Sequence, residues 1–265
     1  MADYRNIDAK AQKDAPKSLT SRSAANVALA VVQDVVRHLD AALIERLRDA
    51  ALGADRDACI AVMHQALKDG VCREDLADFY VPEVARQLGR DWETDDLGFV
   101  GVTIGVSRLQ AMLRELGPEW SGDHSADPDA ASIMVILPQN AYHSLGSMVL
   151  AGQLRRKGFS VRIMLGQGPD EIADMLQHTN FQSVFISASQ SETLETLRRI
   201  VDVVKTATLQ PPPVIIGGSI LEVETENNVT TRTGADYATK RPDEALRVCG
   251  LGAKPRGSVT LMRRT

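Results

Sequence analysis

Aromatic residues are scarce in this chain, since phenylalanine, tryptophan and tyrosine together make up 4% of its 265 residues. Surfaces that stack the bases of single-stranded nucleic acid depend on such rings. A basic face, which broad nucleic-acid binding usually requires, is not indicated either, because the formal net charge is −5. The composition therefore favours a protein or small-molecule partner over direct binding to nucleic acid.

Long apolar runs and paired cysteines are also missing. No stretch of about 18 apolar residues, the length of a membrane span, occurs, and the first twenty residues lack the apolar core of a secretory signal. The three cysteines, Cys59, Cys72 and Cys249, are too widely spaced for a disulfide framework or a zinc motif. These absences predict a cytoplasmic protein with reduced thiols and no membrane partner.

The usual catalytic motifs do not occur. The sequence contains no nucleophile elbow, no P-loop and no zinc-peptidase motif. The acidic runs Glu93–Asp96 and Glu222–Glu226 are interpreted as solvated surface rather than acid–base pairs. We therefore expect a binding protein and not an enzyme.

Two regions with different hydrophobic periods are predicted. Apolar residues recur at helical spacing in the first region, which indicates a small bundle of four or five helices. One stripe consists of Val27, Val31, Val35 and Leu39, and further helices are expected at about 40–52, 56–69, 73–89 and 96–116. The predicted organisation is a flexible arm at 1–20, the bundle at 21–117, a linker at 118–131, a second domain at 132–252 and a basic tail at 253–265.

In the second region, apolar runs rich in β-branched residues alternate with amphipathic stretches. Strands are predicted at 132–137, 159–165, 183–189, 213–218 and 236–239. Helices are predicted at about 144–157, 170–178, 190–207 and 242–250. Alternation at this spacing implies right-handed βαβ units. The expected fold class is α/β, with an N-terminal helical bundle followed by a doubly wound domain with a parallel sheet.

Small and polar residues collect at the predicted carboxyl edge of this sheet. His143 follows the first strand, Ser187 and Ser189 end the third, and Gly217 and Gly218 end the fourth. Open α/β sheets bind ligands at this edge, and glycines allow a ligand to approach the backbone closely. A lone loop histidine is more often structural, but this combination predicts a groove for a long ligand.

The combination resembles the cobalamin-binding domain family, whose signature is Asp-x-His-x-x-Gly, then Ser-x-Leu or Ser-x-Thr, then Gly-Gly, on a flavodoxin-like Rossmann sheet. The matching motifs are Ala141-Tyr142-His143-Ser144-Leu145-Gly146, Ser187-Ala188-Ser189 and Gly217-Gly218, within about residues 131–250. The resemblance implies that these motifs bind cobalamin and that His143 ligates cobalt. Because Ala141 replaces the aspartate that would orient the imidazole, we expect weaker ligation or a backbone carbonyl as its partner.

The helical region carries a second resemblance. The segment LGRDWETDDLGF (88–99) is similar to the Leu-Gly-x-x-Trp segment of the helical cobalamin cap, in which the tryptophan covers the upper corrin face. Trp92 is the corresponding residue, although composition alone allows a core role equally well. Related cobalamin photoreceptors have a Glu-His pair about eleven residues after this tryptophan, where this chain has Val102-Thr103. That departure argues against adenosyl-specific photochemistry of the same kind.

Across its whole length the chain resembles the AerR/PpaA-type antirepressors of photosynthesis genes, most closely over 96–116 and 141–161. The resemblance implies a light-responsive transcription regulator that binds a repressor protein and reaches DNA indirectly through it. Three alternatives stay open: a corrinoid methyl carrier, a haem-binding redox sensor with His143 on iron, and an apo interaction domain. The missing aspartate counts against the methyl carrier, and haem is the weaker cofactor hypothesis. His64 is weighed as a second axial ligand against an ordinary surface or core role.

Overall fold

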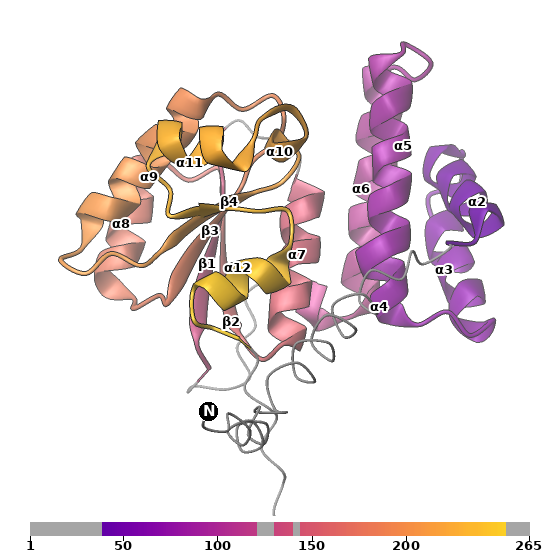
Figure 1. The fold of residues 1–265 in the computed structure, drawn as a ribbon. Coiled ribbons are helices and arrows are strands. Elements are labelled where there is room, and N and C mark those ends of the chain that lie inside the picture. Colours follow the sequence, from indigo (N-terminus) through magenta and orange to yellow (C-terminus); the bar gives the residue numbers. More distant parts are fainter. Residues whose placement is uncertain (1–38, 121–129, 140–143, 253–265) are drawn as a thin grey trace, which may run out of the picture. The chain divides into compact units, whose positions relative to one another are not determined.

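The computed structural model describes residues 39–120, 130–139 and 144–252, which are drawn as ribbon in Figure 1. The chain divides into two compact units, Met1–Asp40 and Ala41–Thr265, and all the helices and strands described below belong to the second. The predicted arm, the stripe from Val27 and the basic tail lie outside the described residues. So do Tyr142 and His143.

The helical region begins with α2 (Ala41–Leu52) and α3 (Ala58–Lys68) and ends with α6 (Phe99–Leu116). In α2 the buried side chains recur at the three- and four-residue spacing of an amphipathic helix, and they are Leu43, Ile44, Leu47, Ala50 and Ala51. Helix α2 packs against both α3 and α6. The helices predicted over 40–52, 56–69 and 96–116 are thereby confirmed, with no end shifted by more than three residues.

Between α3 and α6 lies one continuous helical run, composed of α4 (Arg73–Asp75), the π-helical η1 (Leu76–Tyr80) and α5 (Val81–Glu93). The predicted break at Gly89–Trp92 is wrong, because α5 continues through this segment. A glycine inside a helix costs about 1 kcal/mol relative to alanine. Packing offsets this cost, since Val84 and Leu88 are fully buried and α5 lies beside α6 (Figure 1).

The second region contains a five-stranded sheet. Its strands are β1 (Ser132–Leu137), β2 (Ser160–Leu165), β3 (Ser183–Ser187), β4 (Val214–Gly217) and β5 (Tyr237–Ala238). All neighbouring strands are parallel, in the order β2-β1-β3-β4-β5. This is the flavodoxin-like order of a doubly wound domain. The predicted fold class is confirmed, and every strand lies within two residues of its predicted ends.

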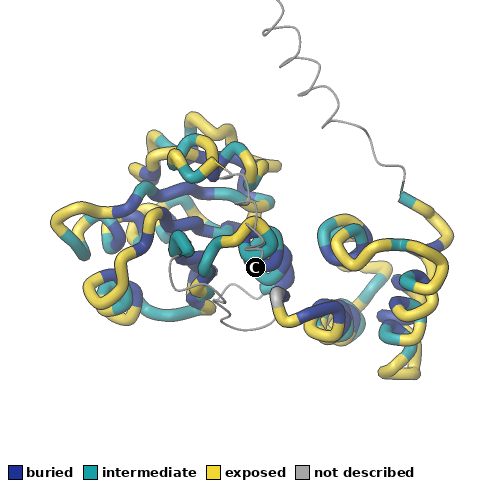
Figure 2. The backbone as a smooth tube through the Cα atoms, turned by 90° about the horizontal axis from the view of Figure 1, so that it is seen from below, coloured by how far each residue is buried: buried dark blue, intermediate teal, exposed yellow. Residues whose placement is uncertain are grey.

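Helices cover both faces of the sheet. They are α7 (Ser144–Arg156), α8 (Pro169–His178), α9 (Leu194–Ala207), α10 (Ile220–Val223), α11 (Glu226–Thr233) and α12 (Pro242–Val248). Side chains of α7 and α12 share one core with the sheet, while those of α8, α9 and α11 share the core on the other face. The central strands β1, β3 and β4 are mostly buried, dark blue in Figure 2, whereas the edge strands β2 and β5 and the outer sides of the helices are partly exposed.

Helices α10 and α11 were not predicted, because residues 222–226 were interpreted as acidic surface. The segment is polar, so its hydrophobic pattern is weak. Its start signal is local: the hydroxyl of Thr225 accepts a hydrogen bond from the backbone N–H of Asn228, which caps α11. Across the described ranges, no helix combines the length and apolar character needed to cross a membrane.

Candidate functional site

The carboxyl ends of β3 and β4 present small residues side by side. Ser187 and Gly217 are cross-strand partners. They lie two residues further along their strands than Phe185 and Ile215, which are also partners. Because side chains on a strand alternate between faces, all four point to the face covered by α7 and α12. A hydroxymethyl group and a hydrogen atom thus replace an aromatic ring and a branched side chain. Ser187 is partly exposed, and no described residue hydrogen-bonds its hydroxyl.

The double glycine has a local structural cause. A Cβ atom at Gly217 would lie 2.8 Å from the carbonyl oxygen of Thr239, and one at Gly218 would lie 2.3 Å from that of Ala188. Gly218 also has a φ of +106°, which side chains rarely tolerate. Both glycines are therefore needed for neighbouring backbones to meet at this edge. That they also line a ligand groove stays a prediction.

The start of α7 is the described part of the histidine motif. Ser144 accepts a hydrogen bond from the Gln110 side-chain amide of α6, with 2.8 Å between Nε2 and Oγ. Leu145 is buried, whereas Gly146 is exposed, and a Cβ atom placed there would meet nothing within 4 Å. Beside the first turn of α7 there is thus open space, on the helix that directly follows His143 in the sequence.

Trp92 lies in the last turn of α5, and 45% of it is exposed. Large apolar side chains are also exposed near the start of α6, where Phe99, Val100 and Ile104 are 69%, 68% and 43% exposed. The core role that composition allowed for Trp92 is therefore wrong.

Two hydrogen bonds connect the turn after Trp92 with the edge of the sheet. The side-chain amide of Gln190, in the loop after β3, donates to Glu93 with 2.9 Å between Nε2 and Oε1. The backbone N–H of the same residue donates to the hydroxyl of Ser219, 3.1 Å away, directly after the double glycine. Three of the predicted segments are thus brought together: the tryptophan turn, the loop after β3 and the loop after β4.

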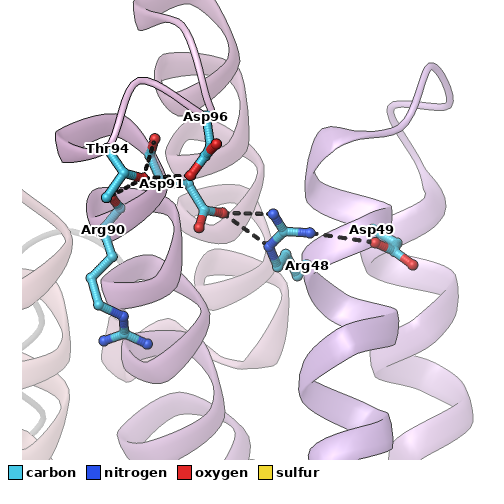
Figure 3. Close-up of polar contacts among 6 residues, drawn as sticks. All are labelled: Arg48, Asp49, Arg90, Asp91, Thr94 and Asp96. Atoms are coloured by element: carbon cyan, nitrogen blue, oxygen red, sulfur yellow. Dashed lines mark hydrogen bonds and ion pairs between the residues drawn. The ribbon is translucent and has the colours of Figure 1, made fainter.

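A partly buried ion pair between α2 and α5 holds the end of α5 in place. Arg48 of α2 donates from Nε and Nη2 to one carboxylate oxygen of Asp91, at 3.1 and 2.6 Å, as drawn in Figure 3. This hydrogen bond raises the pKa of Arg48, so the guanidinium stays charged. The following turn is closed by the hydroxyl of Thr94, which donates to Asp96. The position of Trp92 therefore depends on contacts between α2 and α5.

The remaining predicted residues contribute less. Ser189 is partly exposed, and its hydroxyl pairs with that of Ser191 at 2.8 Å. His64 is exposed on α3, and no group of three metal-ligating side chains occurs within the described ranges. Sequence reasoning missed Gln110 and Gln190, because a single glutamine belongs to no motif. The only available signal was helical phase, which places Gln110 on the same side of α6 as Phe99 and Thr103.

Comparison with known proteins assigns the domain. Residues 131–248 match the model of the B12 binding domain family. Over 166 residues the chain is 34% identical to a Rhodobacter capsulatus protein named "Uncharacterized 20.5 kDa protein in bchF-crtJ intergenic region", a match that covers 63% of this chain and 85% of the relative. This chain belongs to the cobalamin-binding family. The position in the relative's name agrees with the resemblance to AerR/PpaA-type antirepressors.

One solved structure supports the fold of this cobalamin-binding protein, and a second is reported for its similarity alone. The Methanosarcina barkeri monomethylamine corrinoid protein superposes with a TM-score of 0.64 at 16% identity, covering 79% of this chain and 97% of that chain. A cobalamin-binding protein from Desulfitobacterium hafniense DCB-2 has a TM-score of 0.41 at 21% identity, with coverage of 80% and 98%. The first match confirms the α/β architecture with its N-terminal helices.

Cobalamin is therefore the cofactor, and the described residues fit it. The partly exposed Ser187 at the sheet edge and the open side of Gly146 leave room beside α7. Trp92 offers an exposed apolar ring on the turn that is bonded to this edge. The matched family is a binding domain, which supports the expectation of a non-enzymatic protein.

Proposed function

We propose that this protein is a cobalamin-binding, light-responsive antirepressor that acts by binding a transcriptional repressor. It would work in the cytoplasm and reach DNA only through that repressor. The observation that carries the proposal is the bonded path from Glu93 through Gln190 to Ser219, which joins the exposed tryptophan turn to the cobalamin edge. The relative named for the bchF–crtJ region supports a regulatory role over a methyl-carrying one.

In this proposal His143 would ligate cobalt, and Tyr142, its neighbour in the sequence, would contribute to the same binding motif. A neutral imidazole nitrogen suits a transition metal of intermediate softness. Because residue 141 is alanine, the other ring nitrogen would donate to a backbone carbonyl or to water. The free hydroxyl of Ser187 would hydrogen-bond the nucleotide tail, and Gly146 would leave space for it.

The cap would report on the upper face of the cofactor. Bound cobalamin supplies a cobalt centre whose upper ligand can change with light or redox state. Trp92 would cover that face, so a change of ligand alters the room available to its ring. A regulatory effect requires that the two states interact differently with the protein, and such couplings are commonly about 1–3 kcal/mol. Helix α6, which packs against α5, exposes Phe99, Val100 and Ile104 and would carry the change to the partner surface.

The test uses the full chain loaded with hydroxocobalamin, kept in darkness or illuminated. We expect corrin absorption bands that change with light, and a release of the purified repressor from its operator DNA that differs at least about fivefold between the two conditions. Equal release in both conditions would refute the antirepressor function while leaving cobalamin binding intact. Transfer of a cobalt-bound methyl group to an acceptor protein would instead establish the methyl carrier.

A further inference from the structure

Strand β2 forms an open edge of the sheet. In the strand order its neighbour is β1, and no other described strand pairs with its outer side. On the inner side, the N–H groups of Ser160 and Gly166 donate to backbone carbonyls of β1 and the residue before it, at 3.0 and 3.1 Å. Because backbone groups point to alternate sides along a strand of a parallel sheet, the N–H and C=O groups of Val161, Ile163 and Leu165 face outward.

Only the first half of this outer side is protected. Arg155 of α7 donates from Nη2 to the carbonyl oxygen of Val161, 2.9 Å away, and so hinders another strand from pairing there. No described group hydrogen-bonds the outward backbone of Ile163 or Leu165, and the side chain of Leu165 is 48% exposed. The second half of β2 therefore offers backbone donors and acceptors to an added strand.

A pocket lies beside this free half of the strand. It has a volume of about 570 Å³ and is lined by β2, the loop after it and α8. Three carboxylates line it, those of Asp170, Glu171 and Asp174, together with the one guanidinium of Arg162. The side-chain oxygen of Gln167 is buried in its wall, and no described group donates a hydrogen bond to it. A buried acceptor is costly without a donor, so the pocket suits a cationic group with several N–H donors.

The pocket and the free backbone are placed so that one extended chain can reach both. Met164 lines the pocket and belongs to the core on the α8 face of the sheet. In a strand added to β2, every second side chain would lie over this same face. Arginine fits the pocket, because its planar guanidinium carries five N–H donors and pairs with carboxylates. Binding by strand addition takes its affinity from the backbone and its specificity from pockets for alternate side chains.

We propose that the second half of β2 and the adjoining pocket bind an extended segment of a partner protein that carries arginine at alternate positions. The backbone of this segment pairs with Ile163 and Leu165, and its arginines donate to Gln167, Asp170 and Asp174. Strand β1 separates this surface from β3 and β4, which carry two of the cobalamin motifs. The inference goes beyond the proposed function, because the surface is separate from the cofactor site.

The test uses fluorescence anisotropy of the probe peptide fluorescein-Gly-Thr-Val-Arg-Val-Arg-Val-Thr-amide, titrated with the full chain. We expect saturable binding with a Kd below ~1 mM. Replacing both arginines by citrulline, which has nearly the same shape without the charge, should weaken binding at least about fivefold. Two further peptides carry N-methyl groups on the arginine amides or on the valine amides. Since only one of these sets faces β2, one peptide should lose binding and the other keep it. No binding, or equal affinity for all four peptides, would overturn the proposal.

Variants of the protein place the probe on β2. Leu165→Pro removes one outward N–H and leaves the bonds to β1 in place, and Leu165→Val is the matched control that keeps the N–H. At equal circular dichroism, the proline variant should bind the probe at least about fivefold more weakly than the control. In the double variant Asp170→Asn with Asp174→Asn, most of the preference for arginine over citrulline should disappear. Equal binding by both Leu165 variants would refute the pairing, and an undiminished preference would refute the pocket.

Two further measurements distinguish other occupants of the edge. If Arg263→Glu with Arg264→Glu in the full chain tightens probe binding at least about fivefold, the chain's own basic C-terminal residues occupy the edge. If the chain sediments as a dimer that Leu165→Pro dissociates and Leu165→Val does not, a second copy occupies it. Either result would overturn the assignment to a partner protein, whereas unchanged probe affinity and a monomer in all variants support it.

Discussion

Replacing Gly152 by alanine sets two physical effects against each other at one atom. In a helix, alanine is favoured over glycine by about 1 kcal/mol, so propensity alone predicts a more stable protein. The new Cβ atom, however, would lie 2.3 and 2.4 Å from Cδ1 and Nε1 of Trp120. That ring is buried and covered by Arg156, so it has little room to move. Overpacking of this kind costs about 1–3 kcal/mol.

The net expectation for Gly152→Ala is a loss of up to about 2 kcal/mol in the free energy of unfolding. Gly146→Ala is the matched control on the same helix, because a Cβ atom there meets nothing within 4 Å. Its expected effect is a gain of at most about 1 kcal/mol. The difference between the two variants, about 1–3 kcal/mol, isolates the contact with Trp120 from helix propensity.

Urea unfolding of the apo-protein measures this difference. For a slope near 2 kcal/mol per molar urea, the two midpoints should be separated by about 0.5–1.5 M. In a protein that already carries Trp120→Leu, Gly152→Ala should lower the free energy of unfolding by less than it does in the unaltered chain. The smaller leucine leaves room for the new methyl group. If Gly152→Ala stabilises the protein as much as Gly146→Ala does, Trp120 does not pack on this side of α7.

Three further predictions concern the cofactor and the thiols. His143→Ala should lose most bound cobalamin while its circular dichroism stays unchanged, and retention of a full complement with the same absorption spectrum would exclude this residue as the ligand. Gln190→Ala removes the hydrogen bond to Glu93 and should speed cobalamin release severalfold, whereas Gln177→Ala, an exposed glutamine on α8, should not. Equal release rates would mean that this bond does not retain the cofactor. Burial raises the pKa of Cys249 to about 11, with Asp236 adding to the rise, so its alkylation at pH 8 should be slow in the folded protein and fast in urea. Peptide mapping distinguishes this thiol from the exposed Cys72, and rapid labelling of Cys249 itself in the folded chain would contradict the prediction.

The sheet could be predicted closely because its hydrophobic signal is local. In β1 all six residues were predicted, since an apolar run of this length between polar segments leaves little choice of ends. Helix α11 was missed because its buried residues, Val229 and Thr233, are too few to form a stripe. Trp120 lies in a segment whose composition predicts a linker, and only the tertiary contact with Gly152 explains its burial.

The candidate site was predictable in its motifs but not in its connections. The strand-end residues Ser187 and Gly217 were found because topology places parallel strand ends together. The reason for the double glycine was not, because the approach of the Thr239 and Ala188 carbonyls depends on strand packing. Valine at either position would disturb the backbone, so it cannot report on the nucleotide tail alone. Gln110 and Gln190 act through partners 34 and 97 residues away, and no local pattern encodes such pairs.

The π-helical turn at Leu76–Tyr80 keeps the two ends of the run from Arg73 to Glu93 in phase despite an additional residue. A π turn holds about one residue more than an α turn, so the extra residue is taken up within a single turn. Deleting one residue from this turn should restore regular α-helix and leave the direction of the Trp92 indole nearly unchanged. The same deletion between Val81 and Trp92, in regular α-helix, would instead rotate the indole by about 100° relative to Asp78. Homologues that are one residue shorter at Leu76–Tyr80 should therefore expose the same side of α5.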